Sequence, residues 1–90
     1  MNMRAKIFFL LFSISGISLA NDTIRFGSKV LNTRDPVSRV LEIAGTPDNK
    51  VKLLNEYGLP IGERWEYYQK NKTIQVIMYG GMVVEINEIR

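Results

Sequence analysis

The sequence contains no cysteine and no histidine. Without a thiol or an imidazole, the chain lacks the usual activated nucleophile, the usual general base near neutral pH and the usual ligands of zinc. Glu63 and Glu66 stand three residues apart on an expected strand, so they point to opposite faces and do not form a carboxylate pair. We predict that the protein is not an enzyme, with no catalytic residues, no metal site and no cofactor.

The lack of cysteine also bears on how the protein is stabilised and anchored. Small exported domains commonly add disulfides to a core that is too small to hold them together. This chain must rely on packing alone. A lipid anchor of the bacterial type would need a cysteine at the mature N-terminus, so we expect none.

Long uninterrupted apolar runs are absent as well. The apolar segment at 7–12 follows two basic residues and is then broken by serines and a glycine, whereas a membrane-spanning helix needs about 17 to 25 predominantly apolar residues. Ser18-Leu19-Ala20 supplies the small residues that signal peptidase requires. We predict a signal peptide at 1–20, cleaved after Ala20, and a single small domain at 21–90 in the periplasm without a stable membrane anchor.

Charge is nearly balanced in the predicted mature chain. Two of the twelve basic residues, Arg4 and Lys6, lie in the predicted signal, which leaves ten basic residues against nine acidic ones. A nucleic-acid-binding domain would show a clustered excess of lysine and arginine. We therefore predict no nucleic-acid partner.

The segment TRDPVSRVLEIAGTP contains the signals for both ends of a helix at residues 36–44. Asp35 is expected to be the N-cap and Pro36 to occupy the first helical position. Gly45 is expected to end the helix in a left-handed conformation, and Pro47 prevents its continuation. The apolar stripe at helical spacing consists of Val37, Val40, Leu41 and Ala44.

Beyond Lys50 the apolar residues recur with a period of two, which is typical of strands with one buried face. Three segments alternate in this way, at residues 63–69, 72–79 and 82–89. In the first, Trp65 and Tyr67 share a face and are predicted to belong to the core. Their inward-facing partners are expected to be Ile74, Val76, Met78, Met82, Val84 and Ile86.

The turns decide whether these faces coincide, because a slip of one residue turns a strand over. A two-residue loop, Lys70-Asn71, aligns the first two strands. After the second strand, a two-residue loop would bury Glu85. We therefore predict a three-residue loop, Tyr79-Gly80-Gly81, which pairs Met78 with Met82.

These elements predict an α+β fold of two layers, in which a three- to four-stranded antiparallel meander packs on one or two short helices. A fourth strand would contain Val51 and Leu53. The segment at 57–62 contains two glycines and a proline and is expected to be a loop. Near the N-terminus we expect an extended segment and a short helical turn after Gly27.

The outer face of the predicted sheet carries several apolar side chains. A contiguous exposed group of this kind can mark a partner site. Alternatively, the N-terminal segment or the 57–62 loop folds over the face, and the sequence leaves both interpretations open. The candidate partner-binding residues are Tyr68, Ile77, Tyr79 and Val83 on this face, with Leu59 and Ile61 in the loop.

The order of FGSKV, RDPVSRVLEIAGTPD, ERWEYY and IQVIMYGGMVVEIN resembles a family of small exported bacterial domains of unknown function. Its members read roughly R-C-G-x-x-L-V, G-D, E-V-L-x-x-C-G-x-P, W-x-Y and L-x-F-x-x-G-x-L-V-x-I. The chain is more distantly similar to the SmpA/OmlA outer-membrane assembly lipoproteins, which share the helix, G-x-P, W-x-Y and the final hairpin. The resemblance covers residues 25–87 and implies action by binding partners, with no catalytic residue carried over.

Three positions depart from that pattern. Phe26 and Ala44 stand where the family has cysteines, so the resemblance implies that these two side chains lie against each other. Arg34 stands where the family has a glycine before its aspartate. A left-handed residue in that turn is therefore in question.

Three functions follow as hypotheses. The first is a soluble periplasmic interaction module whose partner is another envelope protein. The second is an inhibitor of a secreted or periplasmic hydrolase that acts through the 57–62 loop. The third is carriage of a small ligand, which requires a cavity between helix and sheet.

Overall fold

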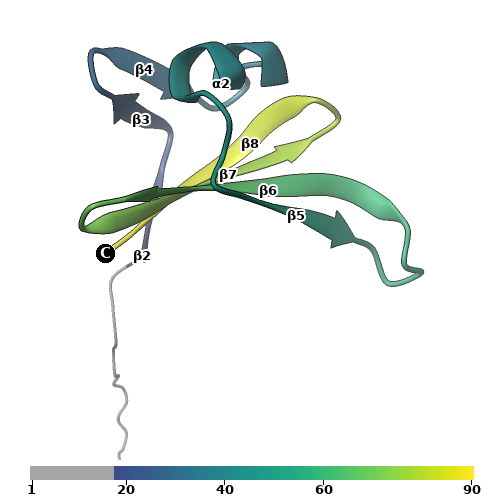
Figure 1. The fold of residues 1–90 in the computed structure, drawn as a ribbon. Helices are drawn as coiled ribbons and strands as arrows, with labels where there is room; N and C mark the ends of the chain where they lie inside the picture. The colour runs from purple at the N-terminus through teal and green to yellow at the C-terminus, as the bar shows by residue number, and fades with distance from the viewer. Residues whose placement is uncertain (1–17) are drawn as a thin grey trace, which may run out of the picture.

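The computed structural model describes residues 18–90, which form an antiparallel sheet covered on one face by a helix and a short hairpin (Figure 1). The five-stranded sheet has the order β2-β8-β7-β6-β5, and β3 and β4 pair separately. The elements are β2 (Ser18–Asn21), β3 (Thr23–Phe26), β4 (Lys29–Asn32), α2 (Val37–Ala44), β5 (Asn49–Leu54), β6 (Pro60–Gln69), β7 (Lys72–Tyr79) and β8 (Met82–Ile89). Among residues 18–90, no helix is long and apolar enough to cross a membrane.

The predicted α+β class is confirmed, but the predicted number of strands is wrong. Five strands form the sheet and two more form the β3–β4 hairpin. The expected helical turn after Gly27 is replaced by the tight turn of this hairpin, with Gly27 at φ 64°. Strands of four residues present only two side chains to each face, so their alternation is too short to recognise.

Strand β2 crosses the position of the predicted signal cleavage. Most of the predicted signal peptide lies outside the described residues, but Ser18–Ala20 pair with Asn87–Ile89 of β8. The sheet therefore begins three residues before the predicted mature N-terminus. Cleavage after Ala20 stays a prediction, and it would remove most of β2 from the sheet.

One apolar core joins the sheet to its cover. Its buried members are Ile24, Leu31, Val40, Ile43, Trp65, Tyr67, Ile74, Val76, Met78, Val83 and Ile86. Tyr67 links the layers, because its ring meets that of Phe26 edge to face at 5.3 Å and its hydroxyl donates to the Gly45 carbonyl at 2.9 Å. Burial, together with the charge of Asp48, raises the pKa of Tyr67 to about 12. Trp65 and Tyr67 are core residues as predicted.

Helix α2 ends at the predicted place but begins and packs differently. Gly45 caps its C-terminus at φ 77° and donates to the Leu41 carbonyl. Pro36, rather than Asp35, is the N-cap, because the Asp35 carboxylate accepts a hydrogen bond from Asn32 N at 2.8 Å. The buried stripe includes Ile43 in place of Leu41, which is 45% exposed. The helix is thus rotated toward Ile43, which lies three residues after Val40 on the same face.

The β6–β7 hairpin has the predicted two-residue loop, and Trp65 pairs with Val76. The β7–β8 hairpin corrects the prediction. Its loop is the two-residue Gly80-Gly81, so Met78 pairs with Val83 rather than with Met82. A bulge then leaves Val84 without a partner and places Ile86, rather than the predicted Val84, opposite Val76. Met82 and Val84, which were predicted to face inward, are exposed. Glu85 stays exposed because the extra residue reverses the alternation.

The outer edge of β8 is covered along most of its length. Near the β7–β8 turn, residues 34–37 exchange backbone hydrogen bonds with residues 81–83, and Arg34 N donates to Val83 O at 2.7 Å. Beyond the bulge, β2 pairs with residues 86–89. The bulge at Val84 therefore lies between two segments that each satisfy part of an otherwise open edge.

Arg34 keeps the left-handed conformation that the resemblance put in question. Its φ is 79°, and within residues 18–90 it is the only residue other than glycine with a positive φ. This conformation costs an L-residue about 1 to 2 kcal/mol. The backbone here is held by the hydrogen bonds to β8, so the strain is retained rather than relaxed.

Replacing Arg34 with glycine is expected to stabilise the protein. The steric cost disappears, while the greater freedom of glycine in the unfolded chain offsets part of the gain. We expect an increase of about 0.5 to 1 kcal/mol in the free energy of unfolding, measured by urea denaturation. Arg39→Gly, on the exposed face of α2, is the control and should destabilise. A lower free energy of unfolding for Arg34→Gly would contradict the inference that Arg34 is strained.

Candidate interaction surface

The strand register places the outward-facing side chains of the sheet in rows. One row joins Asn49, Glu66, Gln75 and Asn87 across strands β5 to β8. A second joins Val51, Arg64, Ile77 and Glu85, and a third joins Leu53, Gly62 and Tyr79. The outer face is thus polar at its centre and apolar at the end nearest the β5–β6 loop.

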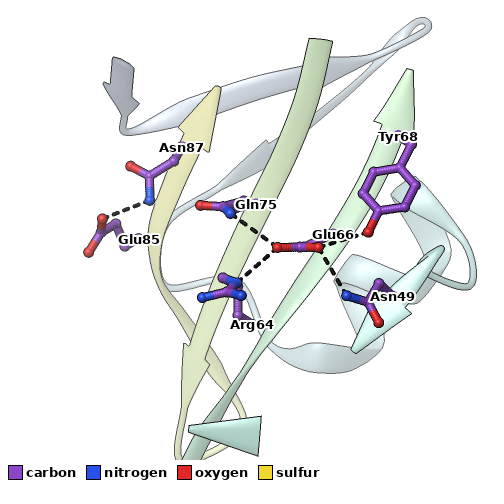
Figure 2. Close-up of polar contacts among 7 residues, drawn as sticks. All are labelled: Asn49, Arg64, Glu66, Tyr68, Gln75, Glu85 and Asn87. Atoms are coloured by element: carbon purple, nitrogen blue, oxygen red, sulfur yellow. Dashed lines mark hydrogen bonds and ion pairs between the residues drawn. The ribbon is translucent and has the colours of Figure 1, made fainter. Parts of the chain in front are cut away.

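Glu66 lies at the centre of the polar part (Figure 2). Its Oε1 accepts hydrogen bonds from Asn49 at 3.1 Å and from the Tyr68 hydroxyl at 2.9 Å. Its Oε2 accepts from Arg64 Nε at 3.0 Å and from Gln75 at 3.1 Å. The hydrogen bond from Asn49 is the largest influence on the pKa of Glu66 and lowers it, with smaller contributions from Tyr68, Gln75 and Arg64, against an opposing effect of burial.

The hydrogen-bonding capacity of this cluster is used by bonds within the protein. The carboxylate already accepts two hydrogen bonds at each oxygen, and its side chain is only 12% exposed. Bonding to Glu66 also raises the pKa of Tyr68. We interpret the cluster as a structural element that ties β5, β6 and β7 together, rather than as a site for a ligand.

The apolar end of the face is built around Gly62. The Tyr79 ring lies against this glycine, because a side-chain carbon added at Gly62 would overlap it. Tyr79 remains 44% exposed, and Ile77 is half-buried beside Arg64. These two candidates lie on the outer face as predicted.

The β5–β6 loop carries the largest group of exposed apolar side chains. The loop predicted at 57–62 is shorter than expected, because β5 ends at Leu54 and β6 already begins at Pro60. Residues 54–61, which are this turn with the adjoining strand ends and are called here the apolar loop, include Leu54, Tyr57, Leu59 and Ile61, which are between 42% and 80% exposed. Figure 1 shows this loop extending away from the body of the sheet, at the end opposite the β6–β7 turn. It therefore does not fold over the outer face, so this loop is not the cover that the sequence left open as an alternative.

Asn55 holds the apolar loop in a defined conformation. Its side-chain oxygen accepts hydrogen bonds from Tyr57 N at 2.8 Å and from Leu59 N at 3.0 Å. Its backbone N–H donates to the Leu59 carbonyl at 2.9 Å, and Gly58 adopts a φ of 79°. Asn55 and Tyr57 were not predicted as site residues, although Asn followed by Gly three residues later is a turn signal.

The six predicted residues separate into three groups. Leu59, Ile61, Ile77 and Tyr79 lie in the apolar loop or on the neighbouring end of the outer face. Tyr68 is 56% exposed, but its hydroxyl belongs to the Glu66 cluster, two rows away from the Tyr79 row. Val83 was wrongly placed on the outer face, because the two-residue turn directs it into the core, where it is completely buried.

Metal-binding geometry is also lacking in the part of the chain that the structure describes, where no group of three or more histidine, cysteine, aspartate or glutamate side chains could hold an ion. Glu63 and Glu66 point to opposite faces of β6, as their spacing predicts. What this surface offers chemically is apolar contact on a fixed backbone. No family model, curated protein or solved structure matches this chain, so the resemblance described above stays a prediction.

Proposed function

We propose that this chain is an exported interaction module that binds another envelope protein through the apolar loop and the adjoining Tyr79 end of the outer face. The observation that carries the proposal is the conformation of residues 54–61, which present four large apolar side chains to solvent on a backbone held by Asn55. A loop that is already ordered loses little conformational entropy on binding, so more of its contact energy appears as affinity.

Removing one apolar side chain from the loop tests this function. Leu59→Asp is expected to weaken partner binding at least about 30-fold, because a buried aspartate at an interface centre costs 2 kcal/mol or more. Leu41→Asp is the matched control, since Leu41 is also exposed but lies on α2. The measurement is recovery of the partner from envelope extract with the exported chain, followed by titration of the recovered partner.

Two results would contradict the proposal. Equal binding by Leu59→Asp and Leu41→Asp would exclude the apolar loop. Loss of binding with Ile77→Asp alone would move the site to the sheet face. Thermal unfolding of each variant shows whether a loss of binding reflects a loss of folding.

Inhibition of a hydrolase is the second candidate, and the same fixed loop favours it. Leu59 is exposed at the tip and is followed by Pro60, and a rigid exposed segment is how many protein inhibitors reach high affinity. Inhibition of an envelope hydrolase by the wild-type chain, retained by Leu41→Asp and lost by Leu59→Asp, would support this candidate. Partner binding without inhibition would exclude the inhibitor and leave the interaction module as the proposed function.

A further inference from the structure

A cavity of about 340 Å³ opens on the covered side of the sheet, which is the face opposite the Tyr79 ring. It lies between the start of α2, the first half of β6 and the β7–β8 turn. Its lining residues are Val37, Gly62, Glu63, Trp65, Met78, Gly80 and Gly81. Two of the seven, Gly80 and Gly81, form the β7–β8 turn and have no side chain to fill the space. The close packing of Val40 and Val76 therefore does not extend to this end of the helix–sheet interface.

Glu63 is the one charged residue among those that line the cavity. Its Oε1 accepts a hydrogen bond from Trp65 Nε1 at 2.6 Å. Within residues 18–90, its Oε2 receives no hydrogen bond or ion pair, although Lys52 lies directly opposite on β5. The carboxylate is thus oriented by the indole and keeps one oxygen able to accept a donor from a ligand.

The remaining side chains of the cavity are apolar. Val37 and Met78 provide aliphatic surface, and Trp65 adds an aromatic ring. The same ring already attracts one ammonium group, because Lys50 Nζ lies 4.9 Å from its centroid. An apolar wall with a single carboxylate is complementary to a ligand with an alkyl stem and a positive end.

We propose that this cavity binds a primary alkylammonium group. The ammonium would donate to the free oxygen of Glu63, and an alkyl stem of about four methylenes would lie against Val37 and Met78. The group would come either from a lysine side chain of a partner polypeptide or from a small free amine. None of the residues that line the cavity belongs to the apolar loop, so the two proposals can fail independently.

Trp65 reports on the site directly, because it is the only tryptophan in the chain. Titration with n-butylammonium chloride is expected to give a saturable change in its fluorescence, whereas n-butanol at the same concentrations should not. Glu63→Gln should weaken binding of the amine about tenfold or more, since a hydrogen bond to a charged carboxylate is stronger than one to a neutral amide. The glutamine oxygen can still accept from the indole, so the ring keeps its position.

Glu56→Gln is the matched control, because Glu56 is an exposed carboxylate in the apolar loop and is not among the residues that line this cavity. It should leave the affinity for n-butylammonium unchanged. Val37→Phe, which places a larger side chain at the cavity, should abolish the saturable change. Thermal unfolding of Glu63→Gln and Val37→Phe tests whether these two variants are folded. The Leu59→Asp variant should bind the amine normally.

A lysine-containing tripeptide with blocked ends distinguishes the two sources. Tighter binding of the tripeptide than of n-butylammonium assigns the site to a polypeptide lysine, and equal or weaker binding assigns it to a small amine. Acetylation of the lysine Nε should abolish binding in either case. The proposal is overturned if no amine gives a saturable change, if n-butanol gives the same change, or if folded Glu63→Gln binds as tightly as the wild type.

Discussion

Gly62→Ala is expected to destabilise the fold by about 3 kcal/mol. An added Cβ would overlap both the Tyr79 ring and the Met78 carbonyl oxygen. The ring could rotate away, but the carbonyl belongs to the backbone of β7, which pairs with β6 on one side and with β8 on the other. Relief of the clash would therefore require the strands to separate locally.

Gly58→Ala is the control that separates this clash from the conformational freedom of glycine. Gly58 has a φ of 79° and no neighbour within 4 Å of an added Cβ, so its substitution should cost only about 1 kcal/mol. Gly62→Ala combined with Tyr79→Ala should recover only part of the lost stability. The second substitution removes the clash with the ring, but the contact with the carbonyl remains. Urea unfolding followed by Trp65 fluorescence provides the measurement. Equal costs at Gly62 and Gly58 would show that close packing at Gly62 is not the cause.

Deletion of Gln75 is expected to unfold the protein, whereas deletion of Val84 is expected to leave it folded. Gln75 pairs with Glu66 on one side and Asn87 on the other, so its removal turns one half of β7 over relative to both neighbours. The resulting loss of core packing costs more than the few kcal/mol of stability that a small domain possesses. Val84 is the unpaired residue of the bulge, and its removal keeps Val83 and Ile86 on the inner face.

The cost of deleting Val84 should be about 1 kcal/mol, arising from adjustment of the two segments that cover the outer edge of β8. Circular dichroism and urea denaturation of the two deletion variants provide the comparison. A folded Gln75 deletion would show that the sheet tolerates a slipped register. An unfolded Val84 deletion would show that the bulge itself, and not only the register, is required.

The features predicted correctly were those determined by neighbouring residues. The C-terminus of α2 follows from Gly45 and Pro47, which act on the backbone within one turn. The β6–β7 hairpin follows from alternation on both sides of a two-residue loop, and it places Trp65 and Tyr67 in the core. Exposure of Leu59 and Ile61 in the apolar loop also needed only local signals.

The errors lie where two local arrangements were nearly equivalent. Around Val83 and Val84, either valine could face the core, and the sequence analysis used a three-residue loop to avoid burying Glu85. The structure reaches the same exposed Glu85 with a shorter loop and a bulge. Residues 34–37, which bond to residues 81–83, help to select this arrangement, and no pattern within β8 could reveal them.

The sequence by itself determined that residues 63–69, 72–79 and 82–89 are strands, where the helix ends and which side chains of β6 are buried, because these depend on contacts between residues close in the chain. Only the tertiary structure decided which valine of β8 is buried, which face of α2 meets the sheet and where a cavity remains. These outcomes depend on segments far apart in sequence competing for the same space, so their energies are not contained in any local pattern.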